Sequence, residues 1–217
     1  MKQTTVERIL DAAEVEFGAH GFVETSLRTI TAKAEVNLAA VNYHFGSKKG
    51  LIQAVTDRFF EPLTEGLQEH LLALSISQLK HHDALVQLYK GLMLEALRIA
   101  QGNPSRLVLF ARLINSAYSQ SQGHLRKHLT HQYAPVFMLF IQAMREHMPV
   151  MDHEQFFWRF HQLMGMMVFT LSNSEALAAI CAAEYSQRRG LPEIVQQLIS
   201  SLVAAAEAPV IAIEKLA

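Results

Sequence analysis

Apolar residues recur at intervals of three and four along almost the whole chain, which is the period of an amphipathic α-helix. No stretch of useful length shows the strict alternation of apolar and polar residues that marks a half-buried strand. Turn residues interrupt the helical pattern, for example at 102–104, 149–152 and 190–192. The chain is therefore predicted to be all-α.

The first predicted helix begins after Thr4, because Thr4 and Glu7 have the S/T-x-x-E spacing of a capping box. Gly21 is predicted to end this helix after His20. An apolar stripe makes it a scaffold helix, and its members are Ile9, Ala12, Ala13, Phe17 and Ala19.

Two shorter helical patterns follow. Leu27, Ile30 and Ala34 fall on one face of a helix that Thr25 or Ser26 caps at its N-terminus. That face is predicted to be core.

The period breaks at residues 35–37 and resumes with Leu38, Val41 and Phe45 on a second helix barely two turns long. These three side chains are also predicted to face the core. A helix, a short turn and a second helix together outline a helix-turn-helix.

The other face of the second helix carries side chains suited to reading DNA. Ala39 and Ala40 are small enough to approach base edges or a thymine methyl group, and Asn42, Tyr43 and His44 offer hydrogen-bonding groups beside them. The alternative is the solvated polar face of an ordinary three-helix core.

Basic residues flank this helix. Lys48 and Lys49 begin the next helix, where ammonium groups meet phosphates beside a groove. Arg28 lies in the first turn of the preceding helix, and its guanidinium has the two-pronged geometry that matches a guanine edge. We expect base or near-base contact from Arg28, Asn42 and Tyr43, and backbone contact from Ser26, His44, Lys48 and Lys49.

The run from Val6 to Val55 resembles the DNA-binding domain of the TetR family of bacterial transcriptional repressors. The matching residues are Gly21-Phe22, Thr25-Ser26, Ile30, Val36, Asn42-Tyr43-His44-Phe45 and Ser47-Lys48-Lys49. Many members of the family have an aromatic residue where this sequence has Asn42, so its operator preference is expected to differ.

Within the family, residues 36–55, 118–127 and 157–161 are similar to fatty-acid-responsive members. The resemblance implies a repressor of fatty-acid degradation genes that leaves double-stranded operator DNA when a long-chain fatty acid or acyl thioester binds. It also implies a homodimer. The alternative is a TetR-type repressor that responds to another hydrophobic, drug-like ligand or to a metal.

Pro62 is predicted to kink or break the helix that Ser47 caps. The domain boundary is therefore expected near residue 60. Residues 1–60 form the helix-turn-helix domain, and residues 61–217 form a larger helical domain for ligand binding and dimerisation.

By resemblance, the helices at about 153–174 and 192–207 pair with their copies across a two-fold axis as a four-helix bundle. The second helix has an apolar face that needs a surface to cover it, made of Ile194, Leu198, Ile199, Leu202 and Val203. Periodicity does not say which chain supplies that surface, so core within a single chain is the alternative.

Methionine and aromatic residues suggest an adaptable apolar lining for a ligand, with Met138, Trp158 and Met164 among them. Such residues are more often plain core. Arg112 lies inside an apolar run, and a buried guanidinium needs an anionic partner. The partner of Arg112 is expected to be Glu95, Glu146 or the head group of an acidic lipid.

Arg159 and His161 pose the same choice between a structural partner and a ligand.

His124, His128 and His131 share one helical face, but no cysteine or carboxylate cluster accompanies them, so no metal site is predicted.

Charge, cysteine content and missing motifs bear on how the protein binds DNA, where it acts and whether it is an enzyme. The net charge of −1 means that DNA binding depends on local placement of cations and on dimerisation. The single cysteine, Cys181, suits a reducing compartment and is expected to be a small buried residue. Neither a signal peptide nor a membrane-spanning run is apparent, so a cytoplasmic protein without a membrane partner is expected. No catalytic motif appears, which predicts neither enzyme activity nor a cofactor.

Overall fold

The computed structural model describes residues 3–75, 77–100, 102–118 and 123–210. The regular secondary structure within these residues is helical, with no strand, as the periodicity predicted. In chain order the helices are α1 (Thr5–Glu24), α2 (Leu27–Lys33), α3 (Leu38–Phe45), α4 (Lys48–Ser75), α5 (His81–Ala100), α6 (Pro104–Ala117), α7 (Gly123–His147), α8 (His153–Ser172), α9 (Ser174–Tyr185) and α10 (Leu191–Glu207).

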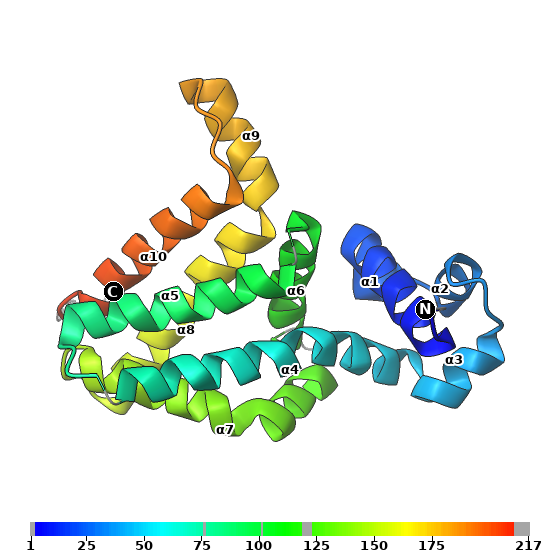
Figure 1. The fold of residues 1–217 in the computed structure, drawn as a ribbon, viewed down its shortest axis with the longest axis horizontal. Helices are drawn as coiled ribbons and strands as arrows, with labels where there is room; N and C mark the ends of the chain where they lie inside the picture. The colour runs from blue at the N-terminus through cyan, green and yellow to red at the C-terminus, as the bar shows by residue number, and fades with distance from the viewer. Residues whose placement is uncertain (1–2, 76, 101, 119–122, 211–217) are drawn as a thin grey trace, which may run out of the picture.

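The N-terminal helices α1, α2 and α3 form a small unit at one end of the molecule (Figure 1). The predicted capping box is present at α1: the Glu7 amide donates to Thr4 Oγ1 at 3.2 Å, and the Thr4 amide donates to Glu7 Oε2 at 2.7 Å. Gly21 has φ of 76°, which kinks the helix, but the helix continues to Glu24. The predicted end after His20 is therefore a kink.

Local caps also set the ends of α2 and α3. Ser26 is the N-cap of α2, and its Oγ accepts the Thr29 amide at 3.0 Å. Asn37 is the N-cap of α3, and its Oδ1 accepts the Ala40 amide at 2.9 Å. Short polar side chains at these positions satisfy amides that have no partner within the helix. The predicted helix-turn-helix outline is confirmed.

Helix α4 joins the N-terminal helices to the remainder of the chain. Ser47 precedes it, and the Gly50 amide donates to Ser47 Oγ at 3.1 Å, as expected for a cap. The helix runs past Pro62 to Ser75, so the predicted break at this proline is wrong. A proline inside a helix removes one backbone hydrogen bond, but the helix continues on both sides of Pro62. The domain boundary near residue 60 stays a prediction.

Helices α4 to α8 and α10 pack together as a bundle, called here the helical body (Figure 1). Helix α5 lies between α4 and α10, and α7 runs along α4. One continuous core joins the body to the N-terminal helices. Among its fully buried side chains are Ile9, Ile30, Phe59, Leu67, Leu85, Tyr89, Leu107 and Met144.

Helix α10 uses most of its apolar face inside its own chain. Leu198, Leu202 and Val203 are buried, and α10 packs against α5 and α8. The prediction that this face awaits a partner is wrong for these three residues, because α5 supplies the surface. The exposed side of α10 is uncharged between Glu193 and Glu207, and consists of Gln196, Gln197, Ser200, Ser201 and Ala204.

Candidate nucleic-acid interface and ligand cavity

Helix α3 is anchored by one side and exposed on the other. Val41 is fully buried, whereas Ala39, Asn42, Tyr43 and His44 are exposed. The Tyr43 side chain is 85% exposed, and its ring lies edge-on to the His44 ring at 5.0 Å. The structure therefore brings the predicted reading residues together on one free face.

Two details of α3 differ from the predictions. Leu38 is 42% exposed rather than core, because at the start of the helix no preceding turn covers it. Ala40 is half-buried, so among the two alanines the exposed one is Ala39. Phe45 is half-buried and packs against the core as expected.

Arg28 is exposed on α2, near the start of the helix. Ser26 is exposed too, but its hydroxyl serves as the cap of α2 and lies 2.8 Å from Thr29 Oγ1. If the Ser26 hydroxyl contacts a phosphate, it does so while it also caps α2. The contacts of both residues with DNA stay predictions.

The two lysines at the start of α4 have different surroundings. Lys48 Nζ donates to the Val23 carbonyl at 3.1 Å and lies 4.5 Å from the centre of the Phe22 ring. Partial burial lowers the pKa of the Lys48 ammonium. Lys49 is exposed. Lys48 therefore ties α4 to the end of α1, and Lys49 is the cation more available to a phosphate.

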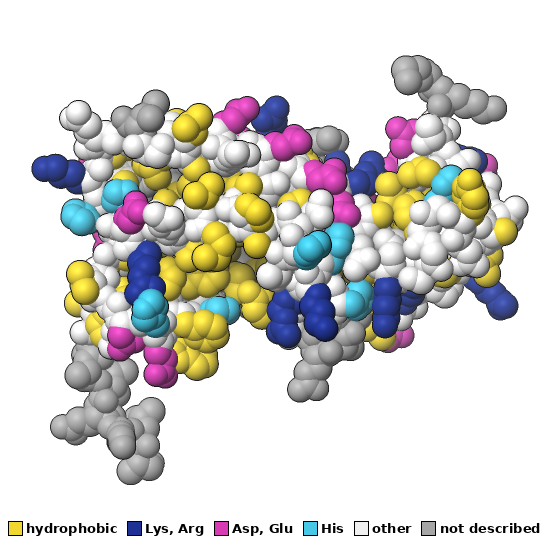
Figure 2. Space-filling view, turned by 90° about the horizontal axis from the view of Figure 1, so that it is seen from below, with side chains coloured by type: hydrophobic (Ala, Val, Ile, Leu, Met, Phe, Trp, Pro, Cys, Tyr) yellow, Lys and Arg dark blue, Asp and Glu magenta, His cyan; other side chains and the backbone are white. Residues whose placement is uncertain are grey.

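A cavity of about 320 Å³ lies inside the helical body. Its volume falls within the range of about 300–1,000 Å³ usual for small-molecule sites. Figure 2 shows hydrophobic side chains gathered around a hollow on this part of the molecule. Helices α4 to α8 line the cavity with Phe60, Leu63, Leu92, Met93, Ala96, Phe110, Ala111, Ile114, Ala117, Tyr118, Leu129, Thr130, Ala134, Phe137, Met138, Phe140, Ile141, Phe160, Met164, Met167, Val168 and Leu171.

Two of the five predicted ligand residues, Met138 and Met164, belong to this lining. Arg112, Trp158 and His161 do not. Trp158 is 57% exposed on the outside of α8, and the His161 ring hydrogen-bonds to the Phe157 carbonyl at 2.7 Å. Tyr118 and Thr130 are the polar residues of the lining. No charged side chain belongs to the described wall.

The prediction that Arg112 is buried is wrong. The side chain is exposed, and its guanidinium donates to the Gly18 carbonyl of α1 at 2.6 Å. Leu109 and Leu113 are buried on the side of α6 that faces the hydrophobic core. Because successive residues of a helix are turned by 100°, Arg112 lies on the opposite side. Glu95 and Glu146 pair elsewhere, with His70 and Gln142 respectively.

Arg159 is half-buried and has a structural partner. Its guanidinium donates to the carbonyls of Ala205 at 2.8 Å and Ala208 at 2.7 Å. These carbonyls lie at the C-terminus of α10, where a cation complements the helix dipole. The structural alternative is therefore the correct one for Arg159.

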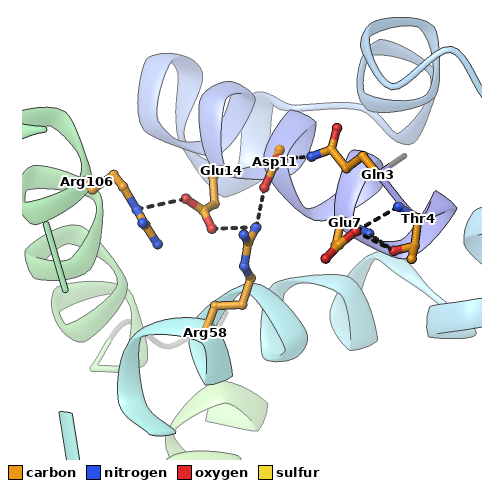
Figure 3. Close-up of polar contacts among 7 residues, drawn as sticks. All are labelled: Gln3, Thr4, Glu7, Asp11, Glu14, Arg58 and Arg106. Carbon is orange, nitrogen blue, oxygen red and sulfur yellow. Dashed lines mark hydrogen bonds and ion pairs between the residues drawn. The ribbon is translucent and has the colours of Figure 1, made fainter. Parts of the chain in front are cut away.

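An ion-pair cluster connects α1 to the helical body (Figure 3). Glu14 on α1 pairs with Arg58 of α4 at 2.8 Å and with Arg106 of α6 at 3.2 Å. Arg58 also pairs with Asp11 at 2.6 Å. Burial raises the pKa of the Glu14 carboxyl, and the two arginines act in the opposite direction. Together with the Arg112 contact to Gly18, the cluster holds α6 against α1.

Sequence reasoning missed this cluster. The spacing of Asp11 and Glu14 places them on one face of α1, but nothing local identifies arginines in α4 and α6 as their partners. Helix α6 thus has two roles: Phe110, Ala111 and Ile114 line the cavity, while Arg106 and Arg112 hold α1.

Of the three histidines expected on one face of α7, His124 and His128 have separate surroundings. His128 Nε2 lies 2.7 Å from Asp57 Oδ1, which also accepts the Tyr133 hydroxyl at 2.7 Å. Burial lowers the pKa of His124, whose ring lies 6.4 Å from that of Phe22. In the part of the chain that the structure describes, no group of three metal-ligating side chains occurs. Cys181 is half-exposed rather than buried, so that expectation is wrong.

A helix-turn-helix with an exposed face, joined by ion pairs to a helical body, is the architecture of a DNA-binding regulator. Two family models match the chain: residues 9–55 match "Bacterial regulatory proteins, tetR family", and residues 92–205 match "Tetracyclin repressor-like, C-terminal domain". The chain belongs to the TetR family. Members of this family are DNA-binding transcription factors rather than enzymes, in agreement with the sequence.

Two curated relatives share part of the sequence. The probable HTH-type transcriptional regulator YttP of Bacillus subtilis is 34% identical over 88 residues, which cover 41% of this chain and 42% of the relative. The HTH-type transcriptional regulatory protein RaaS of Mycobacterium tuberculosis is 33% identical over 115 residues, which cover 52% of this chain and 54% of the relative. The chain thus spans about half the length of the curated relatives it matches.

Solved structures share the fold over nearly the whole chain. AmtR of Mycobacterium smegmatis superposes with a TM-score of 0.58 and 19% identity, covering 95% of this chain and 88% of that one. HlyIIR, a hemolysin II transcriptional regulator, superposes with a TM-score of 0.57 and 19% identity, covering 92% and 97%. At this identity the likeness shows the fold alone.

No single helix among the described residues is long and apolar enough to cross a membrane. Helices α8 and α9 reach the required length and hydropathy only together, and their axes are bent by 71°.

Proposed function

We propose that this protein is a cytoplasmic repressor of fatty-acid degradation genes that binds operator DNA through α3 and is released by a long-chain fatty acid or its thioester. The observation that carries the proposal is the cavity of about 320 Å³ with its almost wholly apolar wall. An acyl chain gains free energy from leaving water for such a wall, at about 25 cal/mol for each Å² of apolar surface buried. The similarity of residues 36–55, 118–127 and 157–161 to fatty-acid-responsive members supports the same choice.

The chemistry of the wall indicates how the ligand is oriented. A carboxylate is costly to bury without a cation, and the described wall has none, so the head group is expected at an opening. Tyr118 lines the cavity and is 48% exposed, with Arg126 close enough to act on its hydroxyl electrostatically. The His161 ring lies 5.8 Å from the Tyr118 ring. We place the acyl chain inside and its head group beside these three side chains.

Coupling to DNA is expected to pass through α6. A ligand pressing on Phe110, Ala111 and Ile114 pushes a helix whose opposite side holds α1 through Arg106 and Arg112. The ligand must prefer one position of α6 to change DNA affinity, since equal affinity for both positions shifts nothing. A coupling of about 1–3 kcal/mol is sufficient.

The proposal includes a homodimer, because two reading helices about 34 Å apart enter successive major grooves on one side of the duplex. The solvent side of α8 offers an apolar contact surface, on which Phe157, Trp158 and Phe169 are each more than half exposed. The uncharged outer side of α10 runs alongside α8. Paired copies of these helices are the expected interface.

The effector is tested by extracting lipid from the purified protein and analysing the extract by mass spectrometry, followed by titration of delipidated protein with oleate and oleoyl-coenzyme A. We expect a retained long-chain acyl species and a rise in thermal stability with one or both compounds. Binding of a neutral, drug-like compound with no response to either acyl ligand would instead support the second candidate, a repressor with a different hydrophobic effector. The apolar wall would also accommodate such a ligand, and the similarity of residues 36–55, 118–127 and 157–161 to fatty-acid-responsive members is what favours an acyl ligand.

A further inference from the structure

The first turn of α7 contacts the N-terminal helices where α1 is kinked. Gly21 makes the kink, and Phe22 follows it directly. The centre of the Phe22 ring lies 5.5 Å from that of Phe17 and 6.4 Å from that of His124 in α7. The ammonium nitrogen of Lys48 in α4 lies 4.5 Å from the centre of the Phe22 ring. His124 therefore connects the helical body to an aromatic contact of the N-terminal helices.

The surroundings of His124 suit its neutral form and not its protonated form. The Nε2 atom is buried and has no hydrogen-bond partner among the described residues. Burial lowers the pKa of His124, and the charges of Lys49 and His128 act in the same direction. His124 also lies in the first turn of α7, where the helix dipole opposes a cation. A protonated ring is therefore more stable in water than in contact with Phe22.

The described charged groups that act on His124 are Lys49 and His128, and neither is an anion. The carboxylates on the neighbouring elements act on other partners: Glu24 acts on Lys48, and Asp57 on His128. The titratable groups of the three elements around the ring are Glu24 of α1, Lys48, Lys49 and Asp57 of α4, and Arg126, Lys127 and His128 of α7.

One turn further along α7, His128 has the opposite surroundings. Its Nε2 lies 2.7 Å from Asp57 Oδ1, which also accepts the Tyr133 hydroxyl at 2.7 Å. A protonated His128 keeps this contact and makes it an ion pair. Acid therefore strengthens the contact of α7 with Asp57 while it weakens the contact of the first turn with Phe22.

We propose that His124 is a proton-sensitive contact between the helical body and the helix-turn-helix unit. The neutral ring packs against Phe22 and restrains the N-terminal helices. In acid the ring takes up a proton and leaves Phe22 for water, while His128 stays on Asp57 and the ion pairs of Glu14 remain. The effect on DNA rests on the proposed function: N-terminal helices with one restraint fewer are less well positioned for the operator, so operator affinity falls.

Thermodynamic linkage gives this contact two signatures. The pKa of His124 is lowered in the folded protein, so the unfolded chain takes up the proton first as the pH falls. Stability is therefore unaffected above the ordinary pKa of 6.5 and falls as the pH drops from there through the lowered pKa. If protonation weakens operator binding by some factor, the operator lowers the proton affinity of His124 by the same factor.

The first test measures the operator dissociation constant of the full chain at about pH 7.5 and about pH 5.5. His124→Phe keeps an aromatic ring that cannot be protonated, and His131→Phe is the matched control at an exposed histidine of α7. Groups on the reading face are the same in all three proteins. We expect acid to weaken operator binding about fivefold more in the parent and in His131→Phe than in His124→Phe.

His124→Lys gives a measurement at one pH. It places a permanent charge beside Phe22, and circular dichroism checks that the variant is folded. At about pH 7.5 we expect its backbone amides in residues 22–25 and 123–128 to exchange with solvent about tenfold faster than those of the parent. In the parent without DNA, the His124 ring protons should titrate below the ordinary value of 6.5 in an NMR experiment.

The inference is overturned if His124 titrates at or above 6.5, or if acid weakens operator binding equally in the parent and in His124→Phe. Parental amide exchange in a folded His124→Lys also overturns it. A parent that binds operator at neutral pH and releases it with oleate leaves the proposed function standing in each case. A parent that does not bind operator contradicts the proposed function, and the NMR titration and amide exchange still decide the role of His124.

Discussion

Neighbouring side chains on the exposed face of the helix-turn-helix are expected to divide two tasks, reading bases and holding phosphates. Asn42 and Tyr43 lie on the free face of α3, and Arg28 is exposed on α2. The cations at the start of α4 differ, because Lys48 is bound to the Val23 carbonyl and Lys49 is exposed. This difference separates the substitutions of two lysines that the sequence alone treats alike.

Lys49→Ala is expected to weaken binding to all DNA sequences by a similar factor, since a phosphate contact carries no base information. The slope of log affinity against log salt should fall by about 1. Lys90→Ala, at an exposed lysine of α5 remote from α3, is the control. Fluorescence anisotropy with specific and random duplexes measures both quantities, and an unchanged salt slope in Lys49→Ala would place the DNA elsewhere. Lys48→Ala should weaken binding in the same way and also lower thermal stability.

Arg28→Ala is expected to relax discrimination at one base pair, with a cost of about 1–3 kcal/mol for the preferred base. Binding to random DNA should change much less. Selection of binding sites from random duplexes by parent and variant reveals the position. Equal discrimination by both proteins would remove Arg28 from the reading surface.

Glu14→Gln removes the charge that Arg58 and Arg106 share. We expect the free energy of unfolding to fall by about 1–3 kcal/mol, because the ion pairs of Glu14 with Arg58 and Arg106 are lost, while the pair of Arg58 with Asp11 remains. If α6 carries the signal, oleate should also change DNA affinity less in this variant than in the parent. Glu65→Gln, at an exposed carboxylate of α4, serves as the control for urea denaturation and DNA titration. A variant with parental stability and parental response to oleate would show that the cluster is dispensable.

At the scale of elements, α6 and α10 each have two sides with different functions. Helix α6 lines the cavity and holds α1, while α10 packs on α5 and turns an uncharged side outward. The start of α5 is further joined to the end of α10, where His82 Nδ1 lies 3.0 Å from both carboxylate oxygens of Glu207.

This α5 to α10 contact is expected to depend on pH. The hydrogen bond and the charge of Glu207 raise the pKa of His82 above its ordinary value of 6.5. A raised pKa in the folded state means that the stabilisation is fully present below about pH 6.5 and is lost as the pH rises through the raised value. His82→Ala should therefore lower thermal stability at about pH 5.5 and have no effect at about pH 9. In Glu207→Gln the same substitution should have no effect at either pH.

The sequence predicted elements that depend on neighbours along the chain. The caps at Thr4 and Ser26 and the burial of Val41 follow from spacing, because the groups involved lie within one helical turn. Arg112 was misjudged because an apolar run does not reveal which side of a helix one residue occupies. The partnership of Arg106 with Glu14 was not predictable, since it joins helices distant along the chain and leaves no periodic signal.

At the scale of the whole molecule, the expected DNA contacts lie at one end and the cavity lies in the helical body; α4 runs from one to the other, and α6 lies between the body and α1 (Figure 1). Regulation requires that a ligand bound in the helical body changes the position of α3 relative to the DNA. In a dimer, a small shift of α6 against α1 alters the separation of the two reading helices, which must stay near 34 Å.

The most direct test measures operator affinity by anisotropy with and without oleate, in the parent and in Ala134→Phe, which fills the cavity from α7. Ala73→Phe, at an exposed alanine of α4, is the matched control. Oleate should raise the dissociation constant of the parent and of Ala73→Phe about fivefold or more, and leave that of Ala134→Phe unchanged. The account would be contradicted if oleate left the operator dissociation constant of the parent unchanged, or if it raised that of Ala134→Phe as much as that of the parent.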